Sequence, residues 1–592
     1  MIIDAAVAHG NRQPLVLETA ELDEPQAGEI LVRIVATGIC HTDLTVLDHA
    51  PLPWPAVLGH EGAGIVERVG ANVTRLRPGD HVVMTSASCG NCSNCLHGQS
   101  SFCLNFRMLN MSGGRRTDGS CILHQHGRPA FGGFLGQSSF AARVLVTERN
   151  AVDRARLAQL FAAQRGHRTA LKRSTAPDRI RRLQRLRTEI ADRTDAIDEA
   201  LHLDLRKPRM GSRNVEVHSV FAEIDTAIAE LELWMQPETV EPSPRFAGNR
   251  AYVQYEPRGV VLLLGPWNFP FSLVFAPLVP IVAAGNACIV KPNEMQPATS
   301  ALVAEIVATV FPENEVACVE GGVRLAEALQ ELPFDHIFFT GSPAVGKRIM
   351  AAAAKHLSSV TLELGGKCPA ILDDAYPIAD AAAKIVGARF TNAGQLCLSV
   401  DYVWVPRTRE QELLAALGAA ITGMFYVDGT LQTSRLSRLV DARNLARVKA
   451  YIDEAVAHGA RLAFGGEIDE ADLTIHPTIV VNPPLDTRIM QEEIFGPVLP
   501  VIGYDSIDAA VDQIDATGKP LALYVFSHDQ AFVDDVLDRT SSGGVTVNHV
   551  LMHYAENRLP FGGVNGSGMG RYKGIHGFRE LSNARSVFVQ AS

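Results

Sequence analysis

Short apolar runs alternate with glycine and other turn residues over the first quarter of the chain. Examples are EILVRIVATG, GAGIVERVG, DHVVMTS and FAARVLVTE, which begin at positions 29, 62, 80 and 140. Brief runs rich in β-branched residues and bounded by turn residues are typical of strands. The pattern predicts a compact, mostly β domain over residues 1–150.

From Val152 the pattern changes to long helical sequence. RARLAQLFAAQ (154–164) and DRIRRLQRLRTEIADRTDAIDEALHLDL (178–205) are rich in arginine. Their apolar residues recur at spacings of three and four, as on a helix at the protein surface. We expect residues 166–178 to interrupt the helices, because Pro177 cannot lie in a helix interior.

A third pattern begins at Val260, where apolar runs suited to buried parallel strands alternate with helical segments. The strand-like runs are VVLLLG, ACIVK, VACVEG and DHIFFTG, and the helical segments between them include PATSALVAEIVATVF, VRLAEALQEL and AVGKRIMAAAAKHL. Such alternation predicts βαβ units in a doubly wound sheet. Sheets of this kind bind nucleotides at the carboxyl ends of their strands.

Length and composition narrow the class of protein. A chain of 592 residues exceeds what one core usually organises, so several domains are expected. The net charge of −11 argues against a nucleic-acid partner. The N-terminal sequence lacks the basic stretch and apolar core of a secretory signal. The longest apolar stretches, including Val260–Leu264 and Leu278–Ala284, are too short or too interrupted to span a bilayer, so a cytoplasmic protein without a membrane partner is expected.

Three motifs in the second half place an amide, a carboxylate and a thiol in a set order. They are PWNFP (266–270), TLELGGK (361–367) and FTNAGQLCLS (390–399). A buried cysteine taken alone is more often inert packing than a nucleophile. Together with QEEIFGPVLP, SSGGVTVNH and LPFGGVNGSGMGRYKGIHGF, however, the motifs resemble the aldehyde dehydrogenase superfamily over residues 157–588. LWMQP and HYAENRLPFGG resemble its coniferyl-aldehyde and fatty-aldehyde branch.

The resemblance implies a multi-domain α/β fold. A Rossmann-like cofactor domain is expected over 151–365, a catalytic domain over 366–570, and a tail with an oligomerisation strand over 571–592. Residues 253–260 resemble part of an oligomerisation arm. The resemblance therefore implies a homodimer or homotetramer, since exposed strand edges favour pairing.

The resemblance also implies the chemistry. Cys397 is expected to attack the aldehyde carbon and form a thiohemiacetal. The Asn268 amide and the Cys397 backbone N–H would stabilise the oxyanion, and Glu363 would activate the water that hydrolyses the thioester. The substrate is expected to be a bulky aldehyde, aromatic or long aliphatic. His553 and Tyr554 either line its funnel or are ordinary loop residues, and Leu396 replaces the small polar residue that relatives often carry beside the thiol.

Cofactor residues follow from the same motifs. The resemblance places NAD, with NADP as an alternative, against Pro266, Trp267, Lys291, Glu294, Gly341, Ser342, Gly365, Glu493 and Phe495. Lys291 and Glu294 are expected near the adenosine ribose, where a carboxylate repels a 2′-phosphate and favours NAD. The amides after Gly341 can face the pyrophosphate. GSPAVGK (341–347) resembles a phosphate-binding P-loop, but Arg348 stands where a hydroxyl would hold magnesium, so ATP binding is not expected.

The first half carries a different chemical signature, in which four cysteines crowd into a short stretch. Cys89, Cys92, Cys95 and Cys103 can close a tetrahedral structural zinc site. With GICHTD, GHEGAGIVERVG and LRPGDHVV, this spacing resembles the GroES-like part of zinc-dependent medium-chain alcohol dehydrogenases, truncated here to residues 1–150. That family binds catalytic zinc with residues matching Cys40 and His60, and Glu61 lies beside them.

The third zinc-binding cysteine of that family and its own nucleotide domain are missing, which leaves three interpretations. The first is an aldehyde dehydrogenase with an N-terminal zinc module. The second is a bifunctional enzyme that oxidises an alcohol at Cys40, His60 and Glu61 and passes the aldehyde onward, for which a hydride acceptor is required. The third is a zinc-dependent scaffold with a vestigial enzyme, against which Cys397, Glu363 and Asn268 argue.

Overall fold

The computed structural model describes residues 1–49, 52–73, 76–89, 92, 103–111, 113, 116, 120–148, 151–152 and 154–591. These divide into two compact units. Unit 1 contains residues 1–162 with the short segment 322–329, and unit 2 contains residues 163–321 and 330–592. No helix in the described part of the chain combines the length and the apolar character needed to cross a bilayer.

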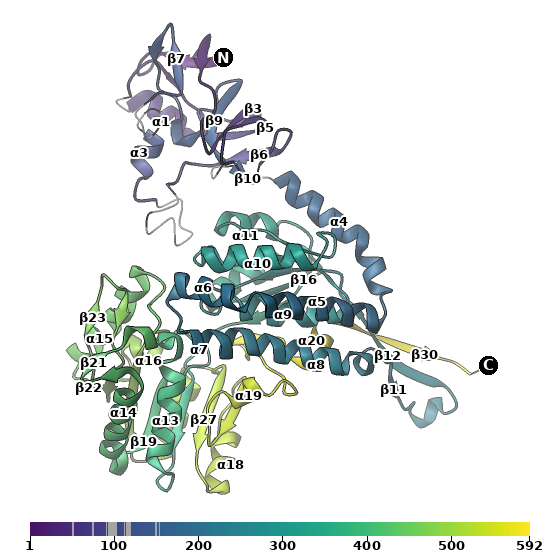
Figure 1. The fold of residues 1–592 in the computed structure, drawn as a ribbon, viewed down its shortest axis with the longest axis vertical. Coiled ribbons are helices and arrows are strands. Elements are labelled where there is room, and N and C mark those ends of the chain that lie inside the picture. Colours follow the sequence, from purple (N-terminus) through teal and green to yellow (C-terminus); the bar gives the residue numbers. More distant parts are fainter. Residues whose placement is uncertain are drawn as a thin grey trace. The chain divides into compact units, whose positions relative to one another are not determined.

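Unit 1 is built from two five-stranded sheets, as the alternating pattern predicts (Figure 1). The first sheet has the order β4-β1-β2-β7-β8, with strands β4 (Ala56–Val57), β1 (Ile2–Ala8), β2 (Val16–Leu22), β7 (Leu123–Gln125) and β8 (Arg128–Pro129). The second has the order β10-β6-β5-β3-β9, with strands β10 (Ala151–Val152), β6 (His81–Met84), β5 (Glu61–Val69), β3 (Glu29–Gly38) and β9 (Arg143–Thr147). Inward-facing residues such as Ile30, Val32 and Val144 form its core.

Unit 1 also holds two short helices that bear on its candidate sites. They are α1 (His41–His49), which follows β3, and α3 (Phe106–Met111). Each helix follows a cysteine of the predicted metal sites: Cys40 immediately precedes α1, and Cys103 lies three residues before α3.

Two helices lead into unit 2, α4 (Arg154–Lys172) and α5 (Ala176–Asp192). The predicted interruption over 166–178 is wrong in extent, because helix α4 continues to Lys172. Pro177 lies in the first turn of α5, where its missing N–H is harmless, and Thr175 caps that helix. The predicted helix over 178–205 is broken at Arg193, after which α6 (Thr194–Leu205) begins.

Unit 2 contains a six-stranded sheet with the order β15-β14-β13-β16-β17-β29. Its first five strands are parallel and match the predicted apolar runs: β15 (Val316–Cys318), β14 (Ala287–Lys291), β13 (Val260–Leu264), β16 (His336–Thr340) and β17 (Ser359–Glu363). β29 (Gly568–Met569) adds to the edge antiparallel.

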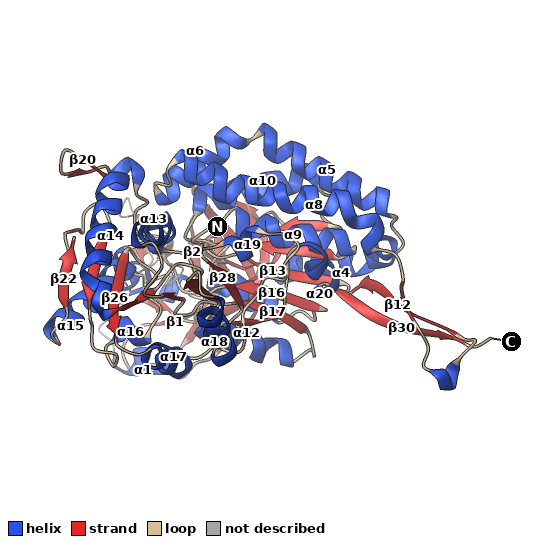
Figure 2. Cartoon of the chain, turned by 90° about the horizontal axis from the view of Figure 1, so that it is seen from below, coloured by secondary structure: helices blue, strands red, loops and turns tan. Residues whose placement is uncertain are grey.

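The helices of this sheet lie on its two faces (Figure 2). One face is covered by α9 (Ser272–Ala284) and α10 (Pro297–Val310), with α5, α6 and α8 (His218–Trp234) packed behind them. The other face carries α12 (Pro343–Ala354). The chain order reverses between β13 and β16, so the topological switch point lies there, where doubly wound sheets bind ligands.

A second, seven-stranded sheet has the order β22-β25-β26-β19-β18-β27-β28. Its strands are β22 (Arg461–Phe464), β25 (Thr478–Val481), β26 (Val498–Tyr504), β19 (Tyr402–Pro406), β18 (Pro369–Leu372), β27 (Ala522–Phe526) and β28 (Gly544–Val547). Helices α13 (Ile378–Arg389), α14 (Glu410–Phe425) and α15 (Ala442–Ala457) accompany it. Both sheets contribute to one continuous apolar core.

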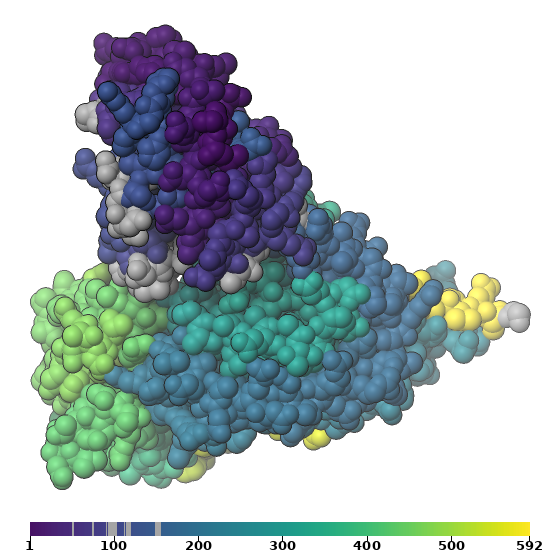
Figure 3. All heavy atoms as spheres, turned by 45° about the horizontal axis from the view of Figure 1, so that its top comes forward, coloured from purple at the N-terminus to yellow at the C-terminus, as the bar shows by residue number. Residues whose placement is uncertain are grey.

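A three-stranded arm stands away from the body of unit 2 (Figure 3). It joins β11 (Glu238–Val240), β12 (Arg250–Pro257) and β30 (Ser582–Val589). All eight residues of β12 pair antiparallel with β30, from Arg250 opposite Val589 to Pro257 opposite Ser582. Phe246 and Phe588 near its tip are half exposed and contact each other with ring centroids 5.5 Å apart. The α/β fold with a β-rich N-terminal part that the sequence predicts is therefore confirmed.

Candidate active site

Cys397 follows a turn with an unusual backbone conformation. Asn392, Ala393 and Gly394 have φ angles of 51°, 53° and 72°, three consecutive left-handed residues. Only glycine fits the third position, because a Cβ atom on Gly394 would lie 2.2 Å from the carbonyl oxygen of Gly496. Left-handed residues other than glycine are costly, so the surrounding contacts must hold this turn in place.

The Cys397 thiol is in an environment that favours its protonated form. Burial raises its pKa, and the nearby carboxylates of Glu493 and Glu363 raise it further. Two backbone amides, its own and that of Leu398, act in the opposite direction by donating hydrogen bonds to the sulfur. Proton loss from Cys397 therefore depends on a change in its surroundings, such as neutralisation of a carboxylate or arrival of a positive charge.

Asn268 connects the loop after β13 to the turn that presents the thiol. Its side-chain amide donates to the carbonyl of Gln395 at 3.1 Å, and its own carbonyl accepts from the Asn392 amide at 2.9 Å. One of the two N–H groups of the Asn268 amide is used in this contact, which leaves the other for an oxyanion. The two predicted residues Asn268 and Cys397 are thus brought together.

A buried ion pair that no sequence motif indicates contacts the backbone of this loop. Lys207 donates to the Asn268 carbonyl at 2.8 Å and pairs with Glu216. Glu216 in turn accepts from the backbone amide of Ser272, the first residue of α9. Loss of either charge would leave the other buried without its partner, which commonly costs about 3–5 kcal/mol.

Glu363 ends strand β17 and is buried, and neither of its carboxylate oxygens has a hydrogen-bond partner among the described residues. Burial raises its pKa well above the ordinary value, although the guanidinium of Arg571 opposes the shift. A Cβ atom on Gly562 would lie 3.0 Å from one carboxylate oxygen, so the glycine leaves room there. A buried, unpartnered carboxyl with a raised pKa has the properties expected of a general base.

The predicted cofactor residues occupy the carboxyl ends of the first sheet. Pro266 and Trp267 follow β13, and Gly341 and Ser342 follow β16, so the two pairs flank the switch point. Ser342 caps α12 by accepting from the amide of Val345 at 3.4 Å. The free amides of the first helical turn remain available to an anion such as a pyrophosphate.

Lys291 and Glu294 lie together at the end of β14. The Lys291 ammonium is almost completely buried and donates to Glu294 at 2.6 Å and to the carbonyl of Pro292 at 3.0 Å. Glu294 is more exposed than its partner. The pair therefore presents a carboxylate, backed by a cation, beyond the carboxyl end of β14, where the family resemblance predicts an adenosine ribose.

Glu493 and Phe495 approach the same region from the loop before β26. The Glu493 carboxylate lies against Gly365, where a Cβ atom would be 1.9 Å from its oxygen. Burial raises the pKa of Glu493 to about 8. Phe495 packs edge-on against Trp267, with ring centroids 5.3 Å apart. The structure thus brings predicted residues from three distant motifs into contact.

Asp401 holds the thiol-bearing turn and the Glu493 loop together. Its carboxylate accepts from Arg389 at 3.0 Å and also pairs with Lys367. Arg389 extends to the carbonyl of Gly496 at 2.8 Å, and Lys367 reaches the carbonyl of Ile489 at 2.7 Å. All three charged side chains are buried, and none could be recognised from sequence because their partners lie tens of residues away.

In unit 1, three of the four predicted structural zinc ligands are described, and they converge. The sulfur atoms of Cys89, Cys92 and Cys103 lie within 4.8 Å of one another. Backbone amides donate to these sulfurs: Cys92 to Cys89 at 3.3 Å, Cys89 to Cys103 at 3.4 Å, and Leu104 to Cys92 at 3.4 Å. Such bonds favour thiolates, the form that binds zinc. Cys95 lies outside the described residues.

The second predicted metal cluster also converges within unit 1. Ligand atoms of Cys40, His60 and Glu61 lie within 4.8 Å of one another. Asp43, which the sequence analysis missed, organises them: it accepts from His60 Nδ1 at 3.0 Å and from the Cys40 amide at 3.1 Å. A carboxylate behind a histidine fixes its tautomer and leaves Nε2 for a metal. Glu61 lies over Gly38, where a Cβ atom would be 2.1 Å from its oxygen.

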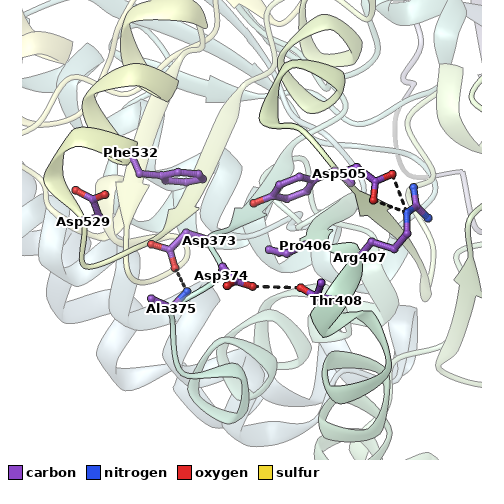
Figure 4. A pocket seen from close by; sticks show the side chains of 10 residues that line it. Asp373, Asp374, Ala375, Pro406, Arg407, Thr408, Asp505, Asp529 and Phe532 are labelled. Carbon is purple, nitrogen blue, oxygen red and sulfur yellow. Dashed lines mark hydrogen bonds and ion pairs between the residues drawn. The ribbon is translucent and has the colours of Figure 1, made fainter.

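A cavity of about 530 Å³ lies elsewhere in unit 2, beside the carboxyl ends of β18, β19 and β26 (Figure 4). Its acidic side chains already have partners, such as Asp505 with Arg407 and Asp374 with Thr408. None of the predicted catalytic or cofactor residues lines it. The candidate active site is therefore the cluster around Cys397 and not this cavity.

Comparison with known proteins shows the family to which the chain belongs. Residues 140–587 match the aldehyde dehydrogenase family, and residues 26–155 match the alcohol dehydrogenase GroES-like domain. A putative aldehyde dehydrogenase AldX of Bacillus subtilis is 43% identical over 73% of this chain and 98% of its own length. A probable coniferyl aldehyde dehydrogenase of Caulobacter vibrioides is 44% identical over 64% of this chain and 81% of its own.

Among solved structures, the substrate-bound AldH of Staphylococcus aureus superimposes with a TM-score of 0.71 and 35% identity, covering 74% of this chain and 94% of the other. The chain therefore belongs to the aldehyde dehydrogenase family. It is an NAD(P)-dependent aldehyde dehydrogenase whose N-terminal part matches the GroES-like domain of alcohol dehydrogenases.

Proposed function

We propose that this enzyme oxidises bulky aldehydes, aromatic or long aliphatic, to carboxylic acids, with Cys397 as the covalent nucleophile. The observation that carries the proposal is the contact between the Asn268 amide and the turn that bears Cys397, with the unpartnered carboxyl of Glu363 in the same electrostatic environment. A nucleophile, an oxyanion donor and a base are the three groups that aldehyde oxidation through a thioester requires.

The proposed reaction runs through two covalent species on the sulfur. The Cys397 thiolate attacks the aldehyde carbon, and the carbonyl electron pair moves to the oxygen, where the Asn268 amide and the Cys397 N–H stabilise it. The same carbon would then lose its hydrogen as a hydride to a bound nicotinamide, and a thioester would remain on Cys397. Glu363 then takes a proton from water, the hydroxide attacks the thioester carbon, and the acid leaves as the thiolate is restored.

The substrate class rests on likeness and on the residues beside the thiol. One relative is named a probable coniferyl aldehyde dehydrogenase, and several are named aldehyde dehydrogenase family 3 member A2. Leu396 precedes Cys397 in the chain, and Tyr554 lies within electrostatic range of the thiol, so we expect both side chains to give an aldehyde an apolar surface beside the nucleophile. Such a surface favours aromatic or long aliphatic chains over small polar ones.

The proposed cofactor is NAD, with NADP as a weaker alternative. Glu294 places a carboxylate where the ribose is expected, and a 2′-phosphate beside it would suffer charge repulsion. Lys291, held by Glu294, could offset part of that repulsion, so some turnover with NADP is expected. The other proposed contacts are Pro266, Trp267, Gly341, Ser342, Gly365, Glu493 and Phe495.

An assay of purified enzyme against matched aldehydes and both cofactors tests the proposal. We expect kcat/KM to rise from short aliphatic aldehydes to aromatic or long aliphatic ones, with the acid as product. We also expect a preference for NAD over NADP of at least about tenfold, corresponding to one repulsive contact of about 1.4 kcal/mol. Equal kcat/KM across the panel would contradict the substrate class, and no acid product would contradict the activity itself.

We further propose that Cys89, Cys92, Cys95 and Cys103 bind a structural zinc ion. Three converging sulfurs that accept backbone N–H bonds suit a closed thiolate site, which would stabilise unit 1 and leave no position for catalysis. A second zinc at Cys40, His60 and Glu61 is the basis of the alternative bifunctional enzyme. The observation that favours it is the Asp43 contact, which orients His60 as a ligand.

Metal analysis separates these possibilities. We expect one tightly bound zinc per chain, retained on dialysis and lost in the Cys103→Ser variant together with a fall in the melting temperature of unit 1, since structural zinc contributes directly to folding. Aldehyde oxidation should remain measurable in an otherwise folded variant. Two zinc ions per chain with NADH formation from alcohols would instead support the bifunctional enzyme, and Cys40→Ser should then abolish only the alcohol reaction.

A further inference from the structure

Lys573 and Glu223 are buried charged residues that are not among the proposed catalytic groups. Lys573 directly precedes helix α20 (Gly574–Glu580), and Glu223 lies on α8. Both side chains are more than nine-tenths buried. Charged side chains are rarely buried so completely unless they are paired or hydrogen-bonded, so the contacts of these two residues indicate their role.

The contacts of Lys573 all fall on one short segment. Its ammonium donates to the carbonyl of Tyr554 at 2.6 Å and to the Asn557 side chain at 2.8 Å. It also lies 3.9 Å above the centre of the Tyr554 ring, a cation–π arrangement. The next residue, Gly574, is so close to Asn557 that a Cβ atom would be 2.4 Å from its carbonyl oxygen.

Glu223 faces this arrangement from α8. One oxygen accepts from the backbone amide of Gly574 at 2.7 Å, and the other has no partner among the described residues. Its negative charge is the main opposite charge felt by Lys573. The pair therefore ties α8 to the segment that carries Tyr554.

That segment borders the nucleophile. It forms the short helix α19 (Met552–Ala555), in which His553 is bound to Thr546 at 2.8 Å and packs 6.2 Å from the ring of Tyr524. The Tyr524 hydroxyl donates at 2.6 Å to the carbonyl of Leu398, the residue after Cys397. Tyr554 is only partly buried, and its hydroxyl lies close enough to Cys397 for the charge of a thiolate there to raise the pKa of the tyrosine.

We propose that Lys573, which feels the buried charge of Glu223, is a positioning residue that holds Tyr554 in place as one wall of the aldehyde pocket and so sets the preference for aromatic aldehydes. The inference rests on the function proposed above. Lys573 does not touch the reacting atoms. Its effect comes from fixing both the backbone and the ring plane of Tyr554, so that a flat substrate meets a rigid surface.

Because Lys573 and Glu223 both titrate, we expect the position of the Tyr554 ring to depend on pH. Burial raises the pKa of Glu223 to about 7, and burial lowers the pKa of Lys573 to about 8. Lys573 keeps its charge below its pKa, and Glu223 carries charge above its own, so both groups are charged only between these two values. The other titratable groups facing Lys573 are Glu556, His553 and Tyr554; His553 stays neutral here because burial lowers its pKa to about 4.

The Lys573→Met variant tests the proposal through the ratio of KM for an aromatic aldehyde to KM for a short aliphatic aldehyde. We expect this ratio to rise about tenfold, the size of one lost pocket interaction, with KM for NAD unchanged. The wild-type ratio should also rise as the pH passes about 8, whereas the ratio in Lys573→Met should stay flat. Lys355→Met, which removes an exposed lysine paired with Glu331, is the matched control and should leave the ratio unchanged.

Two further variants distinguish loss of the proposed positioning from misfolding. Glu223→Gln combined with Lys573→Met removes both buried charges and should give the same changed ratio in a folded protein. Tyr554→Leu, which leaves the pair intact, should raise the ratio by a similar factor. An unchanged ratio in folded Lys573→Met or in Tyr554→Leu would overturn the inference, whereas failure of the wild-type enzyme to oxidise any aldehyde would overturn the proposed function instead.

Discussion

Replacing Cys397 with serine is expected to lower kcat/KM for aldehyde oxidation by at least about 10⁴-fold, since removal of a covalent nucleophile commonly costs this much or more. A serine hydroxyl is a far weaker nucleophile than a thiolate, so it should attack the aldehyde carbon much more slowly. Steady-state NADH formation with an aromatic aldehyde measures the change.

The control for this variant is Cys121→Ala, which removes a buried thiol in unit 1. It should keep full turnover, and both variants should melt near the wild-type temperature. Intact-protein mass should show an acyl adduct on the wild type during turnover and none on Cys397→Ser. Turnover of Cys397→Ser within tenfold of the wild type would contradict the covalent mechanism.

Glu363→Gln is expected to separate the two halves of the reaction. A glutamine cannot accept a proton from water, so thioester hydrolysis should slow by about 10²–10⁴-fold while thioester formation continues. A burst of about one NADH per site, followed by slow turnover, should appear in stopped-flow measurements. The trapped acyl group should be visible on Cys397 by mass spectrometry, and absence of both burst and adduct would contradict the role of Glu363.

The pH dependence of kcat provides a second test of the role of Glu363. Burial raises the pKa of Glu363, so the carboxyl is protonated and inactive as a base at low pH, and kcat should rise as the pH increases through that pKa. This rise should disappear in Glu363→Gln. Glu580, whose charge also raises the pKa of Glu363, offers a matched comparison: Glu580→Gln should move the rise to lower pH without abolishing it.

Hydrophobic periodicity was sufficient to predict the elements that form the two parts of the fold. The apolar run VVLLL and the run HIFFT, which has three apolar residues at its centre, form neighbouring strands that are fully buried, as continuous apolar runs predict. The ends of the helices were predicted less accurately than their presence. The chain remains helical through residues 166–172 because a proline disturbs a helix only back to the residue four positions before it, and Pro177 lies five residues after the end of α4.

The site could be predicted where motifs carry the chemistry and not where charges act through space. Cys397, Asn268 and Glu363 are recognisable because each lies in a distinctive local sequence. Lys207 and Arg389, in contrast, resemble surface residues of amphipathic helices, and only the fold reveals that they are buried against carboxylates. Lys207 and Glu216 lie nine positions apart, Arg389 and Asp401 twelve, and such isolated pairings leave no periodic signal in the chain.

The left-handed turn before Cys397 was equally hidden. Glycine at position 394 hints at an unusual conformation, but Asn392 and Ala393 would be assigned to a helix or a loop by propensity alone. Their conformation is imposed by contacts with Asn268 and Gly496, residues about 100 or more positions away. Such strain persists only where the surrounding structure enforces it.

The pairing of β12 with β30 has a consequence for biosynthesis. Residues 250–257 leave the ribosome more than 300 residues before their hydrogen-bonding partners, Ser582–Val589. Until then β12 presents an open row of backbone donors and acceptors, the kind of edge that joins another nascent chain. Growing polypeptides on one messenger should therefore be most prone to aggregation, and most in need of a chaperone, during this interval of translation.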